Sequence, residues 1–255
     1  MPIHPIAEAF ADAVDDYERG RPEYPQEAVA LLTRTLGLNR SSRTVELGAG
    51  SGKFTRGLLR EGVTPVALEP IGAMRATLKR HSPAVPILAA TAEALPFRDH
   101  TLDAVLAAQA FHWFRPDATM RELARVLRIR GGVGLLWNMR DEEVDWVARF
   151  GEIIRAHEPP DAPHFRSGVW KSAFDGHANA FGPLHLETFH HEHRVDREGL
   201  VARARSVSYI AALPPAELTK VEDEIRALWE QTPELRGREN LAFPYRTDVY
   251  WSFRR

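Results

Sequence analysis

Strand-like and helix-like segments alternate between residues 25 and 139, and this alternation constrains the fold of the chain more than any other feature. Apolar runs typical of strands lie at 43–48, 64–70, 85–91, 101–111 and 131–139. Segments with helical spacing of apolar residues lie at 25–38, 53–62, 71–81 and 116–129. Strands that alternate with helices over short links predict a parallel α/β sheet covered by helices on both faces.

The alternation ends near residue 140. A helix in DEEVDWVARFGEIIRAH is followed by a loop rich in Pro, Gly and His that reaches residue 182. We expect a strand over 183–195, mostly helical structure over 196–231 with a break at Pro214 and Pro215, and an aromatic-rich strand in the last segment, LAFPYRTDVYWSFRR. This second part of the chain therefore differs in organisation from the first.

Composition excludes several classes of protein. The chain has 255 residues, a hydrophobic content of 44% and a net charge of −2, so we expect one sizeable core and no binding of nucleic acid. It has no cysteine, which excludes disulfides, thiolate metal sites and a cysteine nucleophile. The first twenty residues lack the pattern of a signal peptide, and no apolar run approaches the ~20 residues of a membrane span. We expect a soluble cytoplasmic protein without membrane contact.

A glycine-rich turn, VELGAGSGKFTRGLL, follows the first predicted strand at residues 45–59. A phosphate-binding loop of the G-x-x-x-x-G-K-[ST] type is excluded, because Leu47 stands at its first glycine and Phe54 at its hydroxyl position. The dinucleotide pattern G-x-G-x-x-G also fails, because Lys53 or Thr55 occupies its third glycine, depending on the register.

The pattern that fits the turn is E-x-G-x-G-x-G, formed by Glu46, Gly48, Gly50 and Gly52. It resembles the first motif of the class I S-adenosylmethionine-dependent methyltransferases. Glycines allow positive φ and a close approach of the backbone to a ligand. The resemblance implies S-adenosyl-L-methionine as cofactor, with contacts from Glu46, Gly48, Ala49 and Gly50.

A second acid, Glu69, ends the second predicted strand and is followed by Pro70. An acid at this position is placed to accept hydrogen bonds from the ribose hydroxyls of a nucleotide. Enzymes that bind nicotinamide dinucleotides share this feature, so Glu69 indicates an adenosine ribose more than it indicates one cofactor.

Further stretches resemble one branch of the same family. TAEALPFRDHTLDAV at 91–105 is similar to the methyltransferase type 11 branch, which implies that Thr91, Ala92 and Glu93 border the adenine. Met74 then either packs on the adenine or belongs to the core. Gln109, where the fourth strand ends, is expected to contact the methionyl end of the cofactor.

Four other stretches resemble the trans-aconitate methyltransferase-like subgroup of this family. They are YERGRPEYP at 17–25, QAFHWF at 109–114, LLWNMRDE at 135–142 and FPYRTDVYW at 243–251. The resemblance implies that Tyr17 lies over the cofactor. Arg21 is either a partner of the cofactor carboxylate or part of a structural salt bridge.

His112 is the candidate catalytic residue, with Trp113 beside it on the substrate side. A hydroxyl acceptor would gain from His112 as general base, whereas a carboxylate acceptor is already ionised and would need His112 only for positioning. A structural role for His112 beside Trp113 is a third hypothesis.

Other histidines and aromatic residues are further candidates for a site. His191 and His193 share one face of a predicted strand, but the pattern favours a polar strand face and no metal site is predicted. Aromatic residues after residue 136 are candidates for the substrate pocket or for the core; they are Trp137, Trp146, Phe165, Trp170 and Phe174.

The resemblance implies a single methyltransferase domain over 1–255. Its fold is a Rossmann-like, doubly wound sheet of seven strands whose last strand is antiparallel, and residues 1–24 and 140–240 form a small helical cap on the substrate side. We expect methyl transfer to a small molecule at a carboxylate or hydroxyl oxygen. The alternatives are a protein that binds the cofactor without catalysis and an NAD(P)-dependent oxidoreductase. No oligomeric state is predicted.

Overall fold

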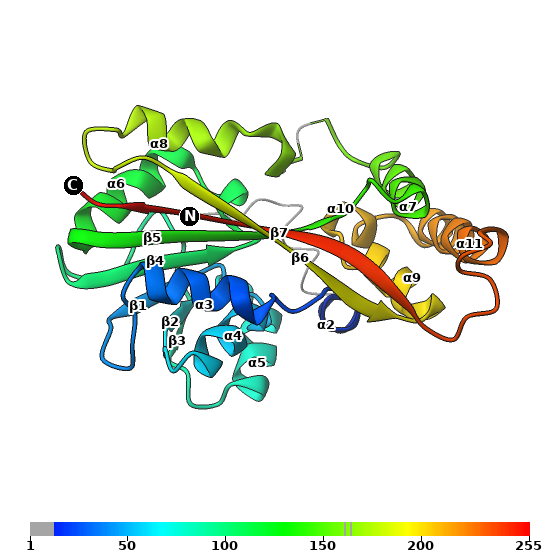
Figure 1. The fold of residues 1–255 in the computed structure, drawn as a ribbon, viewed down its shortest axis with the longest axis horizontal. Coiled ribbons are helices and arrows are strands. Elements are labelled where there is room, and N and C mark those ends of the chain that lie inside the picture. Colours follow the sequence, from blue (N-terminus) through cyan, green and yellow to red (C-terminus); the bar gives the residue numbers. More distant parts are fainter. Residues whose placement is uncertain (1–12, 161, 164) are drawn as a thin grey trace.

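A mixed sheet of seven strands forms the centre of the molecule (Figure 1). The computed structural model describes residues 13–160, 162–163 and 165–255. The strand order is β3-β2-β1-β4-β5-β7-β6. The strands are β1 (Thr44–Leu47), β2 (Val66–Leu68), β3 (Ile87–Leu88), β4 (Leu102–Ala108), β5 (Leu127–Arg140), β6 (His185–Val195) and β7 (Leu241–Phe253). β7 runs antiparallel to both of its neighbours, and the pairs from β3 to β5 are parallel. The predicted α/β fold with an antiparallel last strand is confirmed.

Helices cover both faces of this sheet. On one face lie α3 (Gln26–Thr35), α4 (Lys53–Arg60) and α5 (Gly72–His81), and on the other α6 (Pro116–Val126) and α8 (Ser172–Gly176). Side chains of β4 alternate between the two layers, because Leu106 packs with the cluster of Leu32 and Phe54, whereas Val105 packs with the cluster of Leu123. The strand is therefore buried on both faces, as its continuous apolar sequence predicts.

A second group of helices packs around the far ends of β6 and β7. It contains α7 (Asp145–Arg155), α9 (Arg197–Arg205), α10 (Ser208–Ala211) and α11 (Pro215–Gln231), and we call it the helical lobe. Its own core includes Phe150, Leu200, Ile225 and Phe243. The helix α2 (Val14–Gly20) packs against α9 and ties the N-terminal segment to this lobe.

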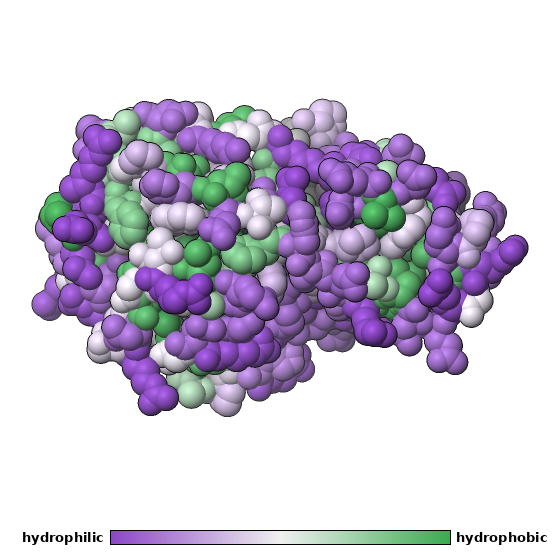
Figure 2. Space-filling model, viewed as in Figure 1, coloured by the Kyte–Doolittle hydropathy of each residue, from purple (hydrophilic) through white to green (hydrophobic). Residues whose placement is uncertain are grey.

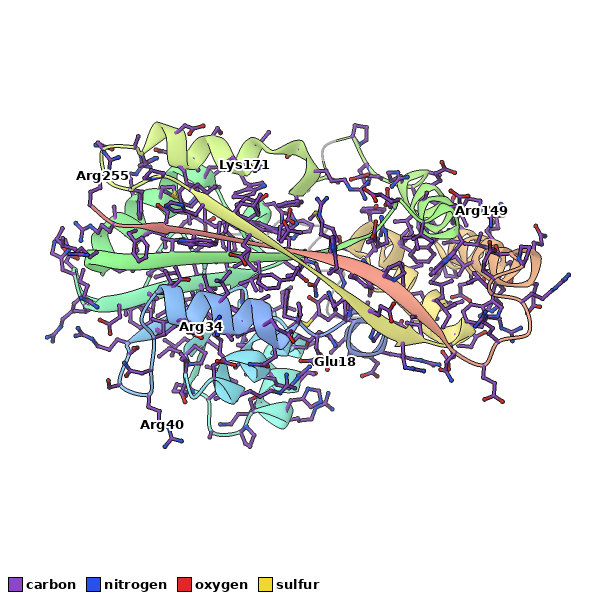
Figure 3. The ribbon with its side chains drawn as sticks, in the orientation of Figure 1. Glu18, Arg34, Arg40, Arg149, Lys171 and Arg255 are labelled. Atoms are coloured by element: carbon purple, nitrogen blue, oxygen red, sulfur yellow. The ribbon has the colours of Figure 1, made fainter. Side chains whose placement is uncertain are left out.

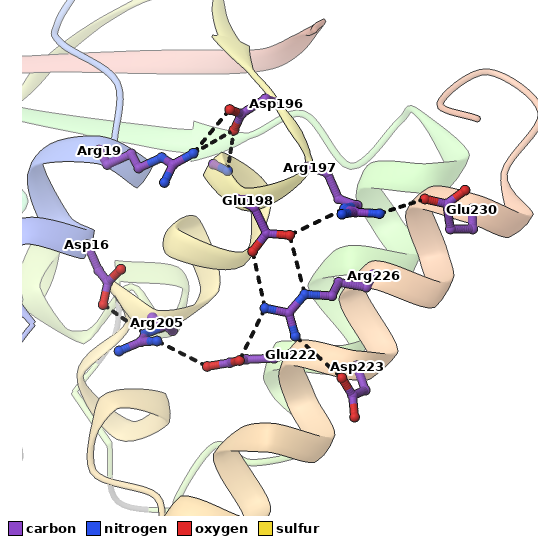
Figure 4. Close-up of polar contacts among 11 residues, drawn as sticks. Asp16, Arg19, Asp196, Arg197, Glu198, Arg205, Glu222, Asp223, Arg226 and Glu230 are labelled. Atoms are coloured by element: carbon purple, nitrogen blue, oxygen red, sulfur yellow. Dashed lines mark hydrogen bonds and ion pairs between the residues drawn. The ribbon is translucent and has the colours of Figure 1, made fainter. Parts of the chain in front are cut away.

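The outer surface of the helical lobe carries a network of ion pairs (Figure 4). Arg226 of α11 binds Glu198 at 3.1 Å and Glu222 at 3.3 Å, and Arg205 of α9 binds Asp16 of α2 at 2.8 Å. Figure 2 shows mostly hydrophilic residues on the surface of both parts of the molecule, and each part also carries smaller hydrophobic patches. In the part of the chain that the structure describes, no helix has the length and apolarity of a membrane span.

Several strand boundaries differ from the predicted ones by a few residues, among them those of β3 and β5. β3 has only two residues where the pattern predicts a strand over 85–91, because pairing with β2 involves only Ile87 and Leu88. β5 begins at Leu127, four residues before the predicted strand, directly after α6 ends at Val126. The carboxyl end of β3 lies three residues before the predicted one, and that of β5 lies one residue after it.

Candidate functional site

A cavity of about 820 Å³ lies between the sheet and the helical lobe. The carboxyl ends of β1, β2, β3, β4 and β5 all contribute to one side of it, as expected for the ligand site of an open α/β sheet. The other side comes from α2, α7, α9 and α10, with the 3-10 turn η3 (Phe165–Ser167). Among the residues predicted for a site, those that line the cavity are Tyr17, Gly48, Gly50, Glu69, Pro70, Met74, Thr91, Ala92, Glu93, Gln109 and His112.

The glycine turn adopts the backbone that its sequence predicts. Gly48, Gly50 and Gly52 have φ angles of 60°, 56° and 91°. A β-carbon at Gly50 would meet no atom within 4 Å, so the turn presents open backbone to the cavity. A β-carbon at Gly48 would lie 2.7 Å from the β-carbon of Ala110, so this glycine also allows the ends of β1 and β4 to approach.

Glu69 joins the glycine turn to the end of β2. Its two carboxylate oxygens accept hydrogen bonds from the backbone N–H groups of Gly50 and Ile71, each at 2.8 Å. Its side chain is almost fully buried, and burial raises the pKa of this carboxyl group above its ordinary value. A carboxylate has about four acceptor positions, so two backbone bonds leave capacity for hydroxyl groups of a ligand.

Glu46 and Ala49 do not line the cavity. Glu46 lies beneath the turn, where its Oε2 accepts a hydrogen bond from Thr55 Oγ1 of α4 at 2.6 Å. Burial raises the pKa of Glu46 to about 8. Ala49 packs with Ala67 and Leu78. In this arrangement Glu46 supports the turn from below, and its role as a direct cofactor contact stays a prediction.

The loop after β3 and the helix after β2 complete this half of the cavity. Met74 is 2% exposed and lines the cavity, so it is at once a buried residue and part of the wall. Glu93 Oε1 accepts a hydrogen bond from the backbone N–H of Arg115 at 3.0 Å, just before α6 begins. Glu93 therefore stabilises the start of α6 in addition to facing the cavity.

Gln109 has a backbone conformation that is rare for its residue type. Its φ is 54°, in the left-handed region, directly after β4 ends. Its Nε2 donates a hydrogen bond to the carbonyl oxygen of Asn138 at 2.6 Å, and Asn138 Oδ1 accepts one from Thr247 Oγ1 at 2.6 Å. Backbone strain of this kind is often found at functional sites, and here it directs the chain toward the cavity.

The N-terminal segment closes one side of the cavity. The Arg21 guanidinium lies 4.8 Å from the centre of the Tyr17 ring, and Arg21 donates hydrogen bonds to Ser206 Oγ and Ser206 O. Lys53, at the start of α4, donates a hydrogen bond to the Glu18 carbonyl oxygen at 2.9 Å. Figure 3 shows Glu18 where the N-terminal helices meet α4 and α5. Of the two alternatives for Arg21, the structural salt bridge is absent among the described residues.

His112 lies in the short turn η2 (Phe111–Trp113) and lines the cavity. The indole Nε1–H of Trp137 donates a hydrogen bond to His112 Nδ1 at 3.1 Å. An indole nitrogen is only a donor, so Nδ1 is the acceptor and the neutral ring carries its proton on Nε2. A neutral His112 held in this way has no lone pair at Nε2 to accept a proton.

Of the five aromatic candidates after residue 136, Phe165 alone lines the cavity, and Trp113, expected on the substrate side, lines it too. Trp146 packs on Phe243 in the core of the helical lobe, with ring centroids 5.1 Å apart. Trp137, Trp170 and Phe174 belong to the core beside the sheet, where Trp137 and Trp170 lie 4.4 Å apart. None of these four residues lines the cavity, and all of them lie in the core, which is the second of the two positions that the sequence left open.

His191 and His193 lie on one face of β6, as their spacing predicts. Burial lowers the pKa of His191 to about 4, and the Nε2 atoms of both rings are buried without a hydrogen-bond partner among the described residues. Over the same part of the chain, no group of three or more His, Asp or Glu side chains converges as a metal site would require.

Sequence reasoning missed a group of arginines where the end of β5 faces the helical lobe across the cavity. Besides Arg21, this part of the cavity is lined by Arg140, Arg155, Arg166 and Arg203. They come from four separate elements, β5, α7, η3 and α9, and no sequence motif unites them. Only the fold brings these positive charges together.

Comparisons with known proteins agree with this geometry. Residues 45–134 match the family described as a methyltransferase domain. An uncharacterized methyltransferase-like protein of Schizosaccharomyces pombe is 34% identical over 95% of this chain and 94% of its own length. An uncharacterized methyltransferase of Mycobacterium bovis is 37% identical over 94% of this chain and 93% of its own. The solved structure of a putative type II methyltransferase from Anaeromyxobacter dehalogenans is 25% identical, with a TM-score of 0.62 over 92% of this chain and 96% of that one.

Proposed function

Since the chain belongs to the class I S-adenosylmethionine-dependent methyltransferases, we propose that it methylates a carboxylate oxygen of a small molecule held between the sheet and the helical lobe. The NAD(P)-dependent alternative is excluded by this family membership. The observation that supports a carboxylate over a hydroxyl acceptor is the hydrogen bond from Trp137 to His112 Nδ1. Because this bond leaves the proton of a neutral His112 on Nε2, the ring has no free lone pair to act as the base that a hydroxyl acceptor would need. The finer assignment to the trans-aconitate-like subgroup stays a prediction.

The residues of the cavity fit the cofactor of this family. Gly50 offers open backbone, and Glu69 retains acceptor capacity for the two ribose hydroxyls. In the proposed arrangement Pro70, Met74, Thr91, Ala92 and Glu93 surround the adenine, while Tyr17 and Gln109 lie along the methionyl part. Arg21 provides a positive charge for the cofactor carboxylate.

The cofactor, when bound, supplies a methyl group on a positively charged sulfur. Transfer to a carboxylate oxygen forms one carbon–oxygen bond and breaks one carbon–sulfur bond, whose electron pair stays on sulfur. The products are a methyl ester and S-adenosylhomocysteine, and no proton is released. A carboxylate is ionised at neutral pH and needs no base. His112 would then orient the acceptor through its Nε2–H, and the cavity would hold the reactants in line.

A panel of acceptors tests this proposal. The protein is incubated with S-adenosylmethionine and either small carboxylic acids or phenols and alcohols of matched size, and products are identified by mass spectrometry. We expect methyl esters from the acids and no ethers from the hydroxyl compounds. Ethers as the main product would overturn the carboxylate assignment. Cofactor binding without turnover on either group would favour the non-catalytic alternative.

The matched control separates binding from transfer. Glu69→Ala should lose turnover in proportion to its loss of cofactor affinity, and saturating cofactor should restore much of it. Glu187→Ala, an exposed change on β6 away from the cavity, should leave turnover unchanged.

A further inference from the structure

We propose that the end of the molecule opposite the cavity binds the surface of a lipid bilayer that contains anionic phospholipids. In this arrangement Ile129 enters the apolar layer and nearby arginines contact the phosphates. The inference goes beyond the proposed methyl transfer and does not depend on the acceptor. The surface lies where β1, β4 and β5 begin, whereas the carboxyl ends of these strands contribute to the cavity. We call it the basic end and define it by six exposed residues, Arg40, Arg43, Arg98, Arg128, Ile129 and Arg130.

A bulge at the start of β5 carries three of these residues. In β4, the paired residues Leu102 and Ala104 are two positions apart. Their partners in β5, Leu127 and Gly132, are five positions apart. Residues 128–131 therefore form a bulge in the ladder between the two strands. The exposed residues of the bulge are Arg128, Ile129 and Arg130.

The backbone of this bulge has a conformation that is rare for its residue types. Arg130 has a φ of 63°, and His100, which precedes β4, has a φ of 58°. Among the described residues, the one other non-glycine residue with a positive φ is Gln109, which lines the cavity. Arg254 connects the two, because its carbonyl oxygen accepts a hydrogen bond from the Arg130 N–H at 2.9 Å and its guanidinium donates one to His100 Nδ1. The surrounding structure thus holds the bulge in a conformation that keeps Ile129 exposed.

Ile129 lies in the middle of the bulge and is 59% exposed. A single exposed apolar residue is common at a protein surface. Here, however, both of its sequence neighbours are arginines, and both are exposed. An apolar side chain between two cations matches the layers of an anionic bilayer, in which charged phosphates lie directly above the acyl chains.

Positive charge at the basic end exceeds the negative charge that pairs with it. Asp103 is shared by Arg43, at 3.7 Å, and Arg128, at 2.6 Å, so one carboxylate serves two guanidinium groups. The arginines of the basic end that form no ion pair with any acid among the described residues are Arg40, Arg98 and Arg130.

Two further acids near this surface are already bound. Asp99 and Glu122 both pair with Arg125, at 2.8 Å and 2.7 Å. Figure 3 shows Arg40 at the end of the molecule away from Arg149 of the helical lobe. The net charge of the whole chain is −2, so the excess of positive charge is local. It is not visible in the composition, from which no membrane contact is expected.

The chemistry of the six residues favours a bilayer over a nucleic acid. Guanidinium groups bind the phosphates of either partner, because their planar N–H pairs match two phosphate oxygens. Single-stranded nucleic acids also stack their bases on aromatic side chains, whereas a duplex is contacted mainly along its charged backbone. The six residues include no aromatic side chain, and an isoleucine gains nothing from a charged backbone. A bilayer, in contrast, places an apolar phase beneath a layer of phosphates.

Sedimentation with vesicles tests the proposal. The full chain is mixed at low salt with vesicles of phosphatidylcholine alone or of phosphatidylcholine with phosphatidylglycerol. We expect sedimentation with the anionic vesicles only, and weaker binding at high salt, because salt screens the charges of the arginines. Ile129→Ser should weaken the binding about tenfold, through the loss of buried apolar surface. A double variant, Arg128→Gln with Arg130→Gln, should weaken it at least as much.

The matched control for Ile129 is Val169→Ser. Val169 is 63% exposed and lies in the 3-10 turn η4 (Val169–Lys171), which packs against η2 and η3 beside the cavity. The control for the arginines is Arg121→Gln, because Arg121 is exposed on α6 and bound to Asp117. Both controls should bind anionic vesicles as the wild type does. Thermal unfolding checks each variant, and Ile129→Ser should keep wild-type turnover in solution.

Equal binding to both kinds of vesicle, or unchanged binding of Ile129→Ser, overturns the proposal. Binding to a single-stranded RNA without binding to anionic vesicles also overturns it and assigns the basic end to nucleic acid. The vesicle assay needs no turnover, so a failure of the proposed methyl transfer is detected separately and leaves the binding result standing.

Discussion

Trp137 donates its indole N–H to His112 Nδ1 at 3.1 Å and thereby determines which ring nitrogen of a neutral His112 carries the proton. Trp137 is fully buried among Phe165, Trp170 and Tyr250, so its position is set by packing and not by a ligand. The core beside the sheet therefore fixes the protonation pattern of a residue in the cavity.

His112→Gln should keep most of the activity, because a glutamine side chain can present an N–H near the position of the histidine Nε2–H. His112→Ala should lower kcat/KM about tenfold to a hundredfold through the loss of that hydrogen bond. The rate should also show no rise with pH through the titration range of histidine. Steady-state kinetics between pH 6 and 9 would check both. If Gln and Ala variants lose activity equally and the wild-type rate rises with pH, His112 acts as a base.

Glu69→Ala should weaken S-adenosylhomocysteine binding by about 1.5–3 kcal/mol, because charge-assisted bonds to the ribose are lost. The same change should lower the melting temperature without ligand, since Gly50 and Ile71 lose their acceptor. Calorimetry and thermal unfolding measure the two effects separately. A lower melting temperature with unchanged affinity would assign Glu69 to the turn alone.

Gly20→Ala should destabilise the protein by about 1–3 kcal/mol, because a β-carbon there would lie 2.4 Å from the backbone nitrogen of Arg203. Moving α2 away from α9 would also displace Tyr17 and Arg21, so cofactor affinity should fall with stability. Gly176→Ala, where a β-carbon meets nothing within 4 Å, is the control and should be nearly neutral. Urea unfolding measures the difference, and equal stabilities of the two variants would contradict the close contact.

Glu46 should make stability depend on pH. Its pKa is about 8 in the folded protein and near 4.5 in an unfolded chain. Between these values the folded state holds a proton that the unfolded state has released, so this contribution to the free energy of unfolding falls as pH rises from 4.5 to 8. The slope approaches about 1.4 kcal/mol per pH unit. Glu46→Gln should flatten it and stabilise the protein at pH 8. An unchanged slope in urea unfolding across this range would show that Glu46 does not cause it.

The fold was predictable because each strand and helix carries a local signal. The period of apolar residues, the prolines at the starts of α6 and α11 and the glycine turn all act over a few residues. Boundaries such as that of β3 depend on pairing with another strand, and no local pattern records that. For this reason the sequence predicts the strands and helices in the correct order along the chain, but it predicts the residues at which they begin and end less well.

In the candidate site, too, residues with a local sequence signal were predictable and residues brought together by long-range packing were not. Gly50, Glu69 and Gln109 follow strand ends, where topology places ligands, so a reading of the sequence could find them. Arg140 and Arg203 lie 63 positions apart in the chain and line the same cavity only because the fold brings β5 and α9 to it. The hydrogen bond between Trp137 and His112 likewise needs the register of two separate segments. Side chains that act through long-range packing leave no trace in local sequence.

Strand β7 has consequences for how the molecule comes apart. Its first residues, around Phe243, belong to the core of the helical lobe, and its later ones, around Val249, belong to the core of the sheet. It is hydrogen-bonded to β5 and β6 along most of its length. Heat or denaturant cannot melt the helical lobe without loosening this strand, so the two halves should lose structure in a single cooperative transition. Substitutions that destabilise the helical lobe should then lower the stability of the sheet as well, because the two parts unfold together.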